Sequence, residues 1–211
     1  MSEGHTESWT FYRERVPAQF NRTWKAQQAA AAQDEAAARL LESMRTVKAT
    51  IRVIVHGPDA EEVHNLDVAD GCMRAGDASA NTPFMTLIHD AASFTPIERE
   101  SGDSILGFLG ALAGMRQDMK LTSQRIQNLS MLDGSLLLEL TGENAFSLTA
   151  HFGNGRLQSE PRCRLRIDSE TYAELRSGAL PPQDAFMSGR VEIEGDMQMA
   201  MQLAVAALSP D

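Results

Sequence analysis

The chain has 211 residues, of which 43% are hydrophobic and 23% are charged, and its formal net charge is -10. These values are ordinary for a soluble globular protein and leave room for one large domain or two small ones. An acidic chain without a run of lysine and arginine is poorly suited to bind the nucleic-acid backbone, so we exclude nucleic acid as a partner. Charge alone would also not hold it on an anionic lipid surface.

The ends of the chain and its cysteines bear on its location. The first residues, MSEGHTESW, are polar, so we expect no signal peptide. The longest apolar run, 105–113, is interrupted by glycine and is too short to span a bilayer. Cys72 and Cys163 lie far apart in the sequence, and we interpret them as two reduced thiols, with a disulfide as the alternative. We therefore expect a cytoplasmic protein.

The N-terminal 47 residues predict helices. Aromatic and aliphatic residues recur every three or four positions at Trp9, Tyr12, Val16, Phe20 and Trp24. Pro17 interrupts this face, which favours two short helices with a kink. The two tryptophans of this segment either pack onto the main body of the protein or belong to a lid or an element that touches a membrane. Residues 25–47 are rich in alanine and contain no glycine or proline, so they predict one uninterrupted helix.

Two β-rich stretches follow, separated by apolar helical sequence. The first predicts strands at 51–55, 63–68, 72–74 and 84–89, after which Asp90 could cap a helix. Residues 98–121 have helical spacing weakened by four glycines, and 122–132 predict a short connecting helix. The second β-rich stretch predicts strands at 135–140, 146–152, 156–159 and 163–168.

The two β-rich stretches align with each other over most of their length. Gly57 falls on Gly142, the turn at 70–71 falls on 154–155, Asp90 falls on Asp168, and Phe94 falls on Tyr172. Only two small gaps are needed. We interpret this as a degenerate internal duplication, with residues of about 45–100 as the second copy; two similar meanders without common origin are the alternative.

The C-terminal tail is densely punctuated. Asp168 or Ser169 caps a predicted helix that ends before Gly178, and Pro182 opens a second short helix that Gly189 ends. Residues 190–194 alternate with period two and predict a strand, and Asp196 caps a last helix.

The last helix is apolar almost all round. From Met197 to Leu208 only Gln198 and Gln202 are polar. One stripe holds Met197, Met201, Val205 and Leu208, and another holds Met199, Leu203 and Ala206. Such a helix must bury more than one face, so the second stripe needs another helix, a partner chain or a ligand as its cover. An ordinary buried core helix is the alternative.

The tail resembles the C-terminal signature of the sterol carrier protein type two family. The run YAELRSGALPPQDAFMSGRVEIEGDMQMAMQLAVAAL contains the proline-containing Ala-Phe-Met-x-Gly helix, the charged strand, the Gly-Asp-Met turn and the apolar helix of that family. The first β-rich stretch departs from this pattern after Phe94, where the glycine-rich segment 105–115 stands instead. A complete second cavity in residues 1–120 is therefore not expected.

The resemblance implies a fold, a ligand and a site. The fold is α/β (α+β), with a curved, mostly antiparallel five-stranded sheet covered by helices and an apolar tunnel between the layers. We expect the chain to divide into two parts. Residues 1–120 would hold the N-terminal helices and a degenerate sterol-carrier-like unit, and residues 121–211 would form the sterol-carrier-like lipid-binding unit. The ligand is a sterol, fatty acid, acyl-CoA, phospholipid or isoprenoid. The expected walls are Phe186, Met187, Val191, Ile193, Met197, Met201 and Val205.

Residues for catalysis are weakly represented. There is no Gly-x-Ser-x-Gly elbow or phosphate-binding loop, and the five histidines are scattered without a cluster for a metal. We expect no enzyme, no cofactor and no metal. The row Arg162, Arg164 and Arg166 is either a solvated strand face or a site for a lipid phosphate.

Three functions remain open from the sequence. The first is binding and transfer of a lipid, with transient membrane contact. The second is an interaction or scaffold protein whose cavity is filled, with a homodimer as one form. The third is an accessory protein of a lipid- or quinone-modifying enzyme.

Overall fold

The computed structural model describes residues 3–79, 81–112, 115, 118–153, 156–157 and 160–208, with the backbone alone at 3–6 and 208. The N-terminal helical segments are α1 (Glu3–Thr10), the π-helix η1 (Phe11–Arg15), α2 (Val16–Ala31) and α3 (Glu35–Arg45). The later helices are α4 (Ala91–Ser101), α5 (Ile105–Leu112), α6 (Ser123–Ser130), α7 (Ser169–Ser177), α8 (Pro182–Met187) and α9 (Met197–Leu208).

The described strands form one eight-stranded sheet in the order β3-β2-β1-β4-β6-β5-β7-β8. Their bounds are β1 (Lys48–His56), β2 (Glu61–Ala69), β3 (Cys72–Gly76), β4 (Met85–Asp90), β5 (Gly134–Thr141), β6 (Phe146–Phe152), β7 (Cys163–Asp168) and β8 (Val191–Gly195). Two neighbouring pairs, β1–β4 and β5–β7, are parallel, and the others are antiparallel. The predicted α/β fold with a mostly antiparallel sheet is confirmed. The sheet has eight strands rather than five because both β-rich stretches contribute to it.

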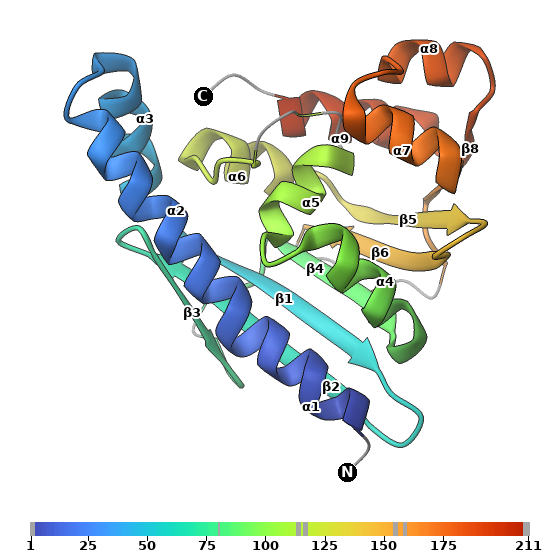
Figure 1. Cartoon of the computed structure of the whole chain (residues 1–211), viewed down its shortest axis with the longest axis horizontal. Helices are drawn as coiled ribbons and strands as arrows, with labels where there is room; N and C mark the ends of the chain where they lie inside the picture. The colour runs from blue at the N-terminus through green and yellow to red at the C-terminus, as the bar shows by residue number, and fades with distance from the viewer. Residues whose placement is uncertain are drawn as a thin grey trace.

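The two faces of the sheet differ in chemistry. On β1, the side chains of Ile51, Val53 and Val55 are buried in the core, whereas Arg52 between them is only partly buried. The same alternation on β7 separates buried Cys163 from Arg164. Figure 1 shows α2, α4 and α5 lying in front of the strands. The period of two therefore directs one apolar face toward the helices and a more polar face away from them.

The two β-rich stretches share a strand register. In the parallel pair β1–β4 the last residues paired are His56 and Asp90, and in β5–β7 they are Thr141 and Asp168. Asp90 accepts a hydrogen bond from the Ser93 amide at 2.7 Å, and Asp168 accepts one from the Thr171 amide at 2.8 Å. Each aspartate thus caps the helix after its strand. This equivalence supports the predicted duplication, which stays a prediction, as does the division at residue 120.

The structure corrects two local predictions and leaves one untested. Residues 25–47 form two helices, because Asp34 adopts an extended backbone and caps α3 by accepting a hydrogen bond from the Ala36 amide at 2.9 Å. The predicted kink at Pro17 is replaced by a change of helix type. The π-helix η1 ends before α2 begins, and Pro17 lies in the first turn of α2. The strand predicted at 156–159 lies partly outside the described residues, and Arg156 and Leu157 are not in a strand.

The N-terminal helices dock on the sheet through a buried polar cluster. The Tyr12 hydroxyl lies 2.8 Å from His89 Nε2, and His89 Nδ1 lies 2.8 Å from the carbonyl oxygen of Asp90. Because a carbonyl only accepts, Nδ1 donates and neutral Nε2 accepts from the tyrosine. Arg13 Nε donates to His64 Nδ1 at 3.1 Å, which leaves His64 Nε2 facing Glu62 at 3.3 Å. This arrangement of donors and acceptors suits both imidazoles in the neutral form.

Acid should weaken this docking. Burial lowers the pKa of His89, and burial together with the Arg13 guanidinium lowers the pKa of His64. A folded-state pKa below the unfolded value means that the unfolded chain binds more protons, so stability is lost as the pH falls below about 6.5. We expect the free energy of unfolding, measured in urea, to decline between about pH 7 and 5. His89→Gln should flatten this decline, whereas exposed His56→Gln should leave it unchanged.

Candidate functional site

An apolar cavity of about 170 Å³ lies between the sheet and the helices. Its floor comes from the central strands β4, β5, β6 and β7, and its cover comes from α5, α6, α9 and the segment before α6. The lining side chains are those of Met85, Leu109, Leu112, Met119, Leu129, Leu136, Leu138, Leu148, Ala150, Phe152, Leu165, Ala200, Leu203, Ala204 and Ala207. No charged or hydrogen-bonding side chain is among them, so within the described residues the lining suits only an apolar occupant.

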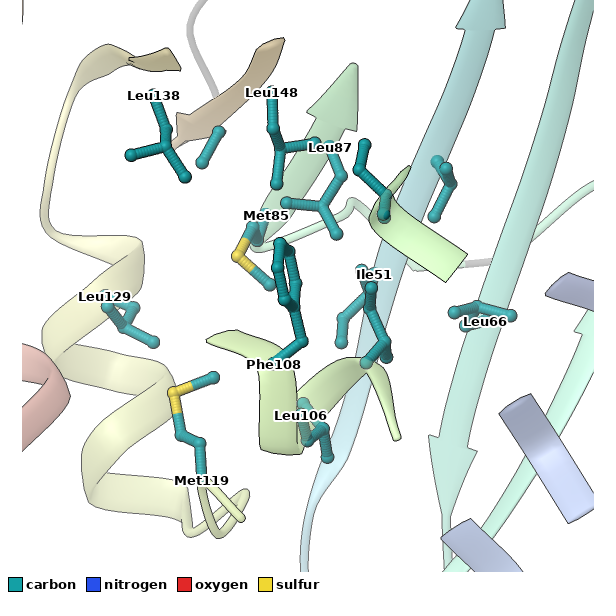
Figure 2. Close-up of a cluster of buried hydrophobic side chains, with 14 of the residues drawn as sticks. Ile51, Leu66, Met85, Leu87, Leu106, Phe108, Met119, Leu129, Leu138 and Leu148 are labelled. Atoms are coloured by element: carbon teal, nitrogen blue, oxygen red, sulfur yellow. The ribbon is translucent and has the colours of Figure 1, made fainter. Parts of the chain in front are cut away.

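Strands from both β-rich stretches build the floor. Met85 on β4 pairs with Phe152 on β6, and Leu136 on β5 pairs with Ala150 on β6. Figure 2 shows Leu148 and Leu138 on neighbouring strands, with Met85 below them and Leu129 and Met119 on the side of the helices. The cavity is therefore not confined to the C-terminal unit, because its edge at β4 belongs to the first stretch.

The cover leaves space because it carries small residues. The side of α9 that faces the cavity presents Ala200, Ala204 and Ala207, with Leu203 as the one large side chain. Opposite them the strands present leucines and phenylalanine, so facing pairs do not fill the gap. Space left between facing side chains forfeits van der Waals contacts, so this arrangement packs less tightly than a filled core.

Polar contacts at both ends hold α9 over the cavity. Asp196 accepts a hydrogen bond from the Met199 amide at 3.0 Å and is ion-paired with Arg162. At the other end, buried Arg125 on α6 donates from Nε to the Ala207 carbonyl at 3.1 Å and from Nη1 to the Lys120 carbonyl at 2.6 Å. A cation at a helix C-terminus also interacts favourably with the helix dipole. One side chain thus ties α6, α9 and the preceding segment together.

The seven side chains predicted as cavity walls lie elsewhere. Phe186 and Met187 on α8 are 40% and 75% exposed. Met197, Met201 and Val205 form the outward stripe of α9 and are 43%, 64% and 70% exposed. Val191 and Ile193 on β8 are partly buried and pack against the core. The structure does not bring these residues to the cavity, and their contact with a ligand stays a prediction.

The predicted walls on α9 belong to its exposed stripe, whereas the other stripe of this helix faces the cavity. The second stripe, with Met199 and Leu203, faces inward: Met199 is buried and Leu203 lines the cavity. The walls on the strands could have been found from their alternation, since Leu136 and Leu138 share a face in the predicted strand 135–140. Their convergence with α5 and α9 depends on tertiary packing, which no local pattern encodes.

The arginine row lies on the opposite face of the sheet. Arg166 donates to Glu139 at 3.1 Å, and Arg164 donates to Glu194 at 3.2 Å. These cross-strand ion pairs fit the interpretation as a solvated face rather than as a phosphate site. Burial raises the pKa of the Cys163 thiol, so this cysteine is held in its unreactive protonated form. Within the described residues, no group of three or more His, Cys, Asp or Glu could hold a metal.

The comparison with protein families falls on the same part of the chain. Residues 117–207 match the model of the SCP-2 sterol transfer family. The resemblance noted in the tail is thereby confirmed, and the matched segment contains β5–β8, α6–α9 and most of the cavity lining. It leaves out the N-terminal helices and β1–β4. No curated protein matches the chain.

Solved structures similar to the chain include sterol carrier proteins. Sterol carrier protein 2-like 2 from Aedes aegypti is 18% identical, with a TM-score of 0.32 over 54% of this chain and 94% of that one. The second sterol carrier protein domain of Helicoverpa armigera is 19% identical, with a TM-score of 0.32 over 64% and 98%. Likeness at this level carries no information about the ligand. No described helix has the length and hydropathy to cross a membrane.

Neighbouring leucines on β5 test the cavity. Leu138 lines it and is buried, whereas Leu137 points to the opposite face and is only partly buried. We expect Leu138→Ala to lower the free energy of unfolding by about 2–5 kcal/mol, because the substitution enlarges a space that is already present. Leu137→Ala should cost about 1 kcal/mol or less. Urea titration of both variants measures the difference, and equal losses would argue against a cavity on this side.

Proposed function

We propose that this protein binds a lipid or other apolar ligand in the cavity between the central strands and helices α5, α6 and α9, and that it carries the ligand without transforming it. The observation that supports this most is the wholly apolar cavity, most of whose lining belongs to the segment that matches the SCP-2 sterol transfer family. That family match supports sterol or lipid binding and transfer in general terms.

Energetics favour an occupant over an empty space. A void of this size weakens the packing of every residue around it. Filling it with an apolar group restores those contacts, and a ligand that binds only the folded chain also raises its stability. The ligand must be apolar where it meets the lining, because no lining side chain could pair with a buried polar group there.

The volume sets a further condition. Sites for small molecules usually measure about 300–1,000 Å³, so about 170 Å³ accommodates only part of a lipid in this conformation. Helix α5 is the element best suited to move aside. It contains Gly107 and Gly110, which weaken the helix, and it is followed by a segment without regular structure at 118–120. We infer that a longer ligand enlarges the space by displacing α5.

Blocking the cavity provides the test. Ala150 on β6 lines the cavity, and its neighbour Thr149 points to the opposite face of the sheet. Ala150→Phe should fill the space and reduce binding of the apolar dye Nile red at least tenfold, because ring and dye compete for one volume. Thr149→Phe adds bulk where no cavity lies and should leave dye binding unchanged. Fluorescence titration measures both.

Native mass spectrometry after gentle purification complements this titration. We expect an apolar molecule to accompany the unsubstituted chain and to be absent from Ala150→Phe. A chain that retains no apolar molecule and binds no dye would contradict the proposal.

A second function rests on a different surface. The outward stripe of α9, with Met197, Met201 and Val205, is exposed, as are Phe186 and Met187 on α8. Exposed apolar side chains of this size are typical of surfaces that meet a partner or a membrane. Such a stripe would serve an interaction protein or a homodimer. It would equally serve an accessory protein that presents a ligand to a lipid- or quinone-modifying enzyme. Light scattering at several protein concentrations distinguishes the homodimer.

A further inference from the structure

A second, smaller pocket adjoins the apolar cavity on the side of the N-terminal helices. It has room for a water-sized group, about 20 Å³, and lies between α2 and the start of α5. Its lining includes Phe20, Trp24, Leu106 and Met119. Met119 also lines the cavity, so its side chain lies between the two spaces. The Met119 amide donates to the Leu106 carbonyl at 3.1 Å, which fixes it beside α5.

The small pocket differs from the cavity in chemistry. Polar side chains contribute to its wall, among them Thr23 and Gln27 from α2 and Ser104 before α5. Both polar atoms of the Gln27 amide are shielded from solvent and have no hydrogen-bond partner among the described residues. A shielded amide without partners costs free energy that a suitable guest would recover. It offers one group that donates and one that accepts.

The charged groups around this pocket largely offset one another. The Asp103 carboxylate is held by Arg15 at 2.7 Å, and Asp118 accepts a hydrogen bond from the Ser104 hydroxyl at 2.8 Å. Lys120 lies on the same wall and supplies one positive charge against Asp118. Among the residues of this wall that the structure describes, neither sign of charge is in excess, so their charge selects no ion. The wall therefore favours an uncharged group that can both donate and accept a hydrogen bond.

We propose that the small pocket, through the Gln27 amide, receives the hydroxyl end of an apolar alcohol whose hydrocarbon part occupies the cavity beyond Met119. This inference rests on the proposed function and specifies the ligand as an uncharged long-chain or isoprenoid-type alcohol. Methionine suits the position between the two spaces because its unbranched side chain adapts to a chain passing beside it. The subsite uses α2, which lies outside the residues matched by the family model.

Competition against bound Nile red tests this assignment with three ligands of equal chain length. Dodecanol donates and accepts, its methyl ether only accepts, and dodecanoate is charged. We expect dodecanol to displace the dye at about tenfold lower concentration than the ether or the carboxylate, because only the alcohol can donate to the amide oxygen without bringing a charge.

Gln27→Leu should remove this preference, so that alcohol and ether compete equally. Gln28→Leu is the matched control, since Gln28 is the next residue of α2 and is exposed; it should keep the tenfold preference. The melting temperature of each variant reports whether it is folded. Gln27→Asn provides a second variant. It keeps the amide on a side chain that is one methylene shorter, and it should reduce the preference for the alcohol.

The outcomes separate the two proposals. If alcohol and ether compete equally in the unsubstituted chain, a resident water or a small rearrangement satisfies the amide, and the hydroxyl subsite is wrong while the cavity stands. The same conclusion follows if Gln27→Leu and Gln28→Leu behave alike. If none of the ligands displaces the dye from a chain that binds it, or if the dye does not bind, the proposed function itself fails.

Discussion

The antiparallel pairing of β4 with β6 is the constraint on which the arrangement of the molecule depends. It joins Met85–Ile88 of the first β-rich stretch to Thr149–Phe152 of the second, and so makes one sheet of two units. Because the register places Met85 opposite Phe152, the apolar faces of both units point to the same side. A slip of one residue would turn one unit's apolar face toward solvent. The common core, the cover of helices and the cavity all require this register.

The same pairing explains why the first unit can lack a C-terminal tail of its own. In the second unit β7 pairs with β8, and the corresponding strand of the first unit, β4, pairs with β6 instead. The edge of β4 that would otherwise be exposed is therefore covered by the neighbouring unit. The glycine-rich segment that follows the first β-rich stretch forms α5, which covers the cavity rather than enclosing a second one. Under the predicted duplication, the missing tail of the first copy and the sharing of one cavity would be parts of a single arrangement.

Local sequence signals predicted the elements better than the site. Caps at Asp90, Asp168 and Asp196 are short-range hydrogen bonds, and each was visible in the sequence because it involves residues three positions apart. The break at Asp34 was missed because alanine-rich sequence on both sides masks a single capping residue. The cavity walls were missed because they come from seven separate helices and strands and from the segment before α6. Their meeting point depends on the β4–β6 register, which no pattern within either stretch specifies.

The orientation of α9 shows how a sequence can specify a space. An ordinary amphipathic helix turns its largest apolar side chains inward and leaves small or polar ones outside. Here Ala200, Ala204 and Ala207 face the strands while Met201 and Val205 face outward. Arg125 and the Asp196 cap fix this rotation at both ends, because turning the helix would break its hydrogen bonds to them. Met199 and Leu203 also face inward, so the open volume lies beside the three alanines. That volume is the feature on which the proposed ligand binding depends.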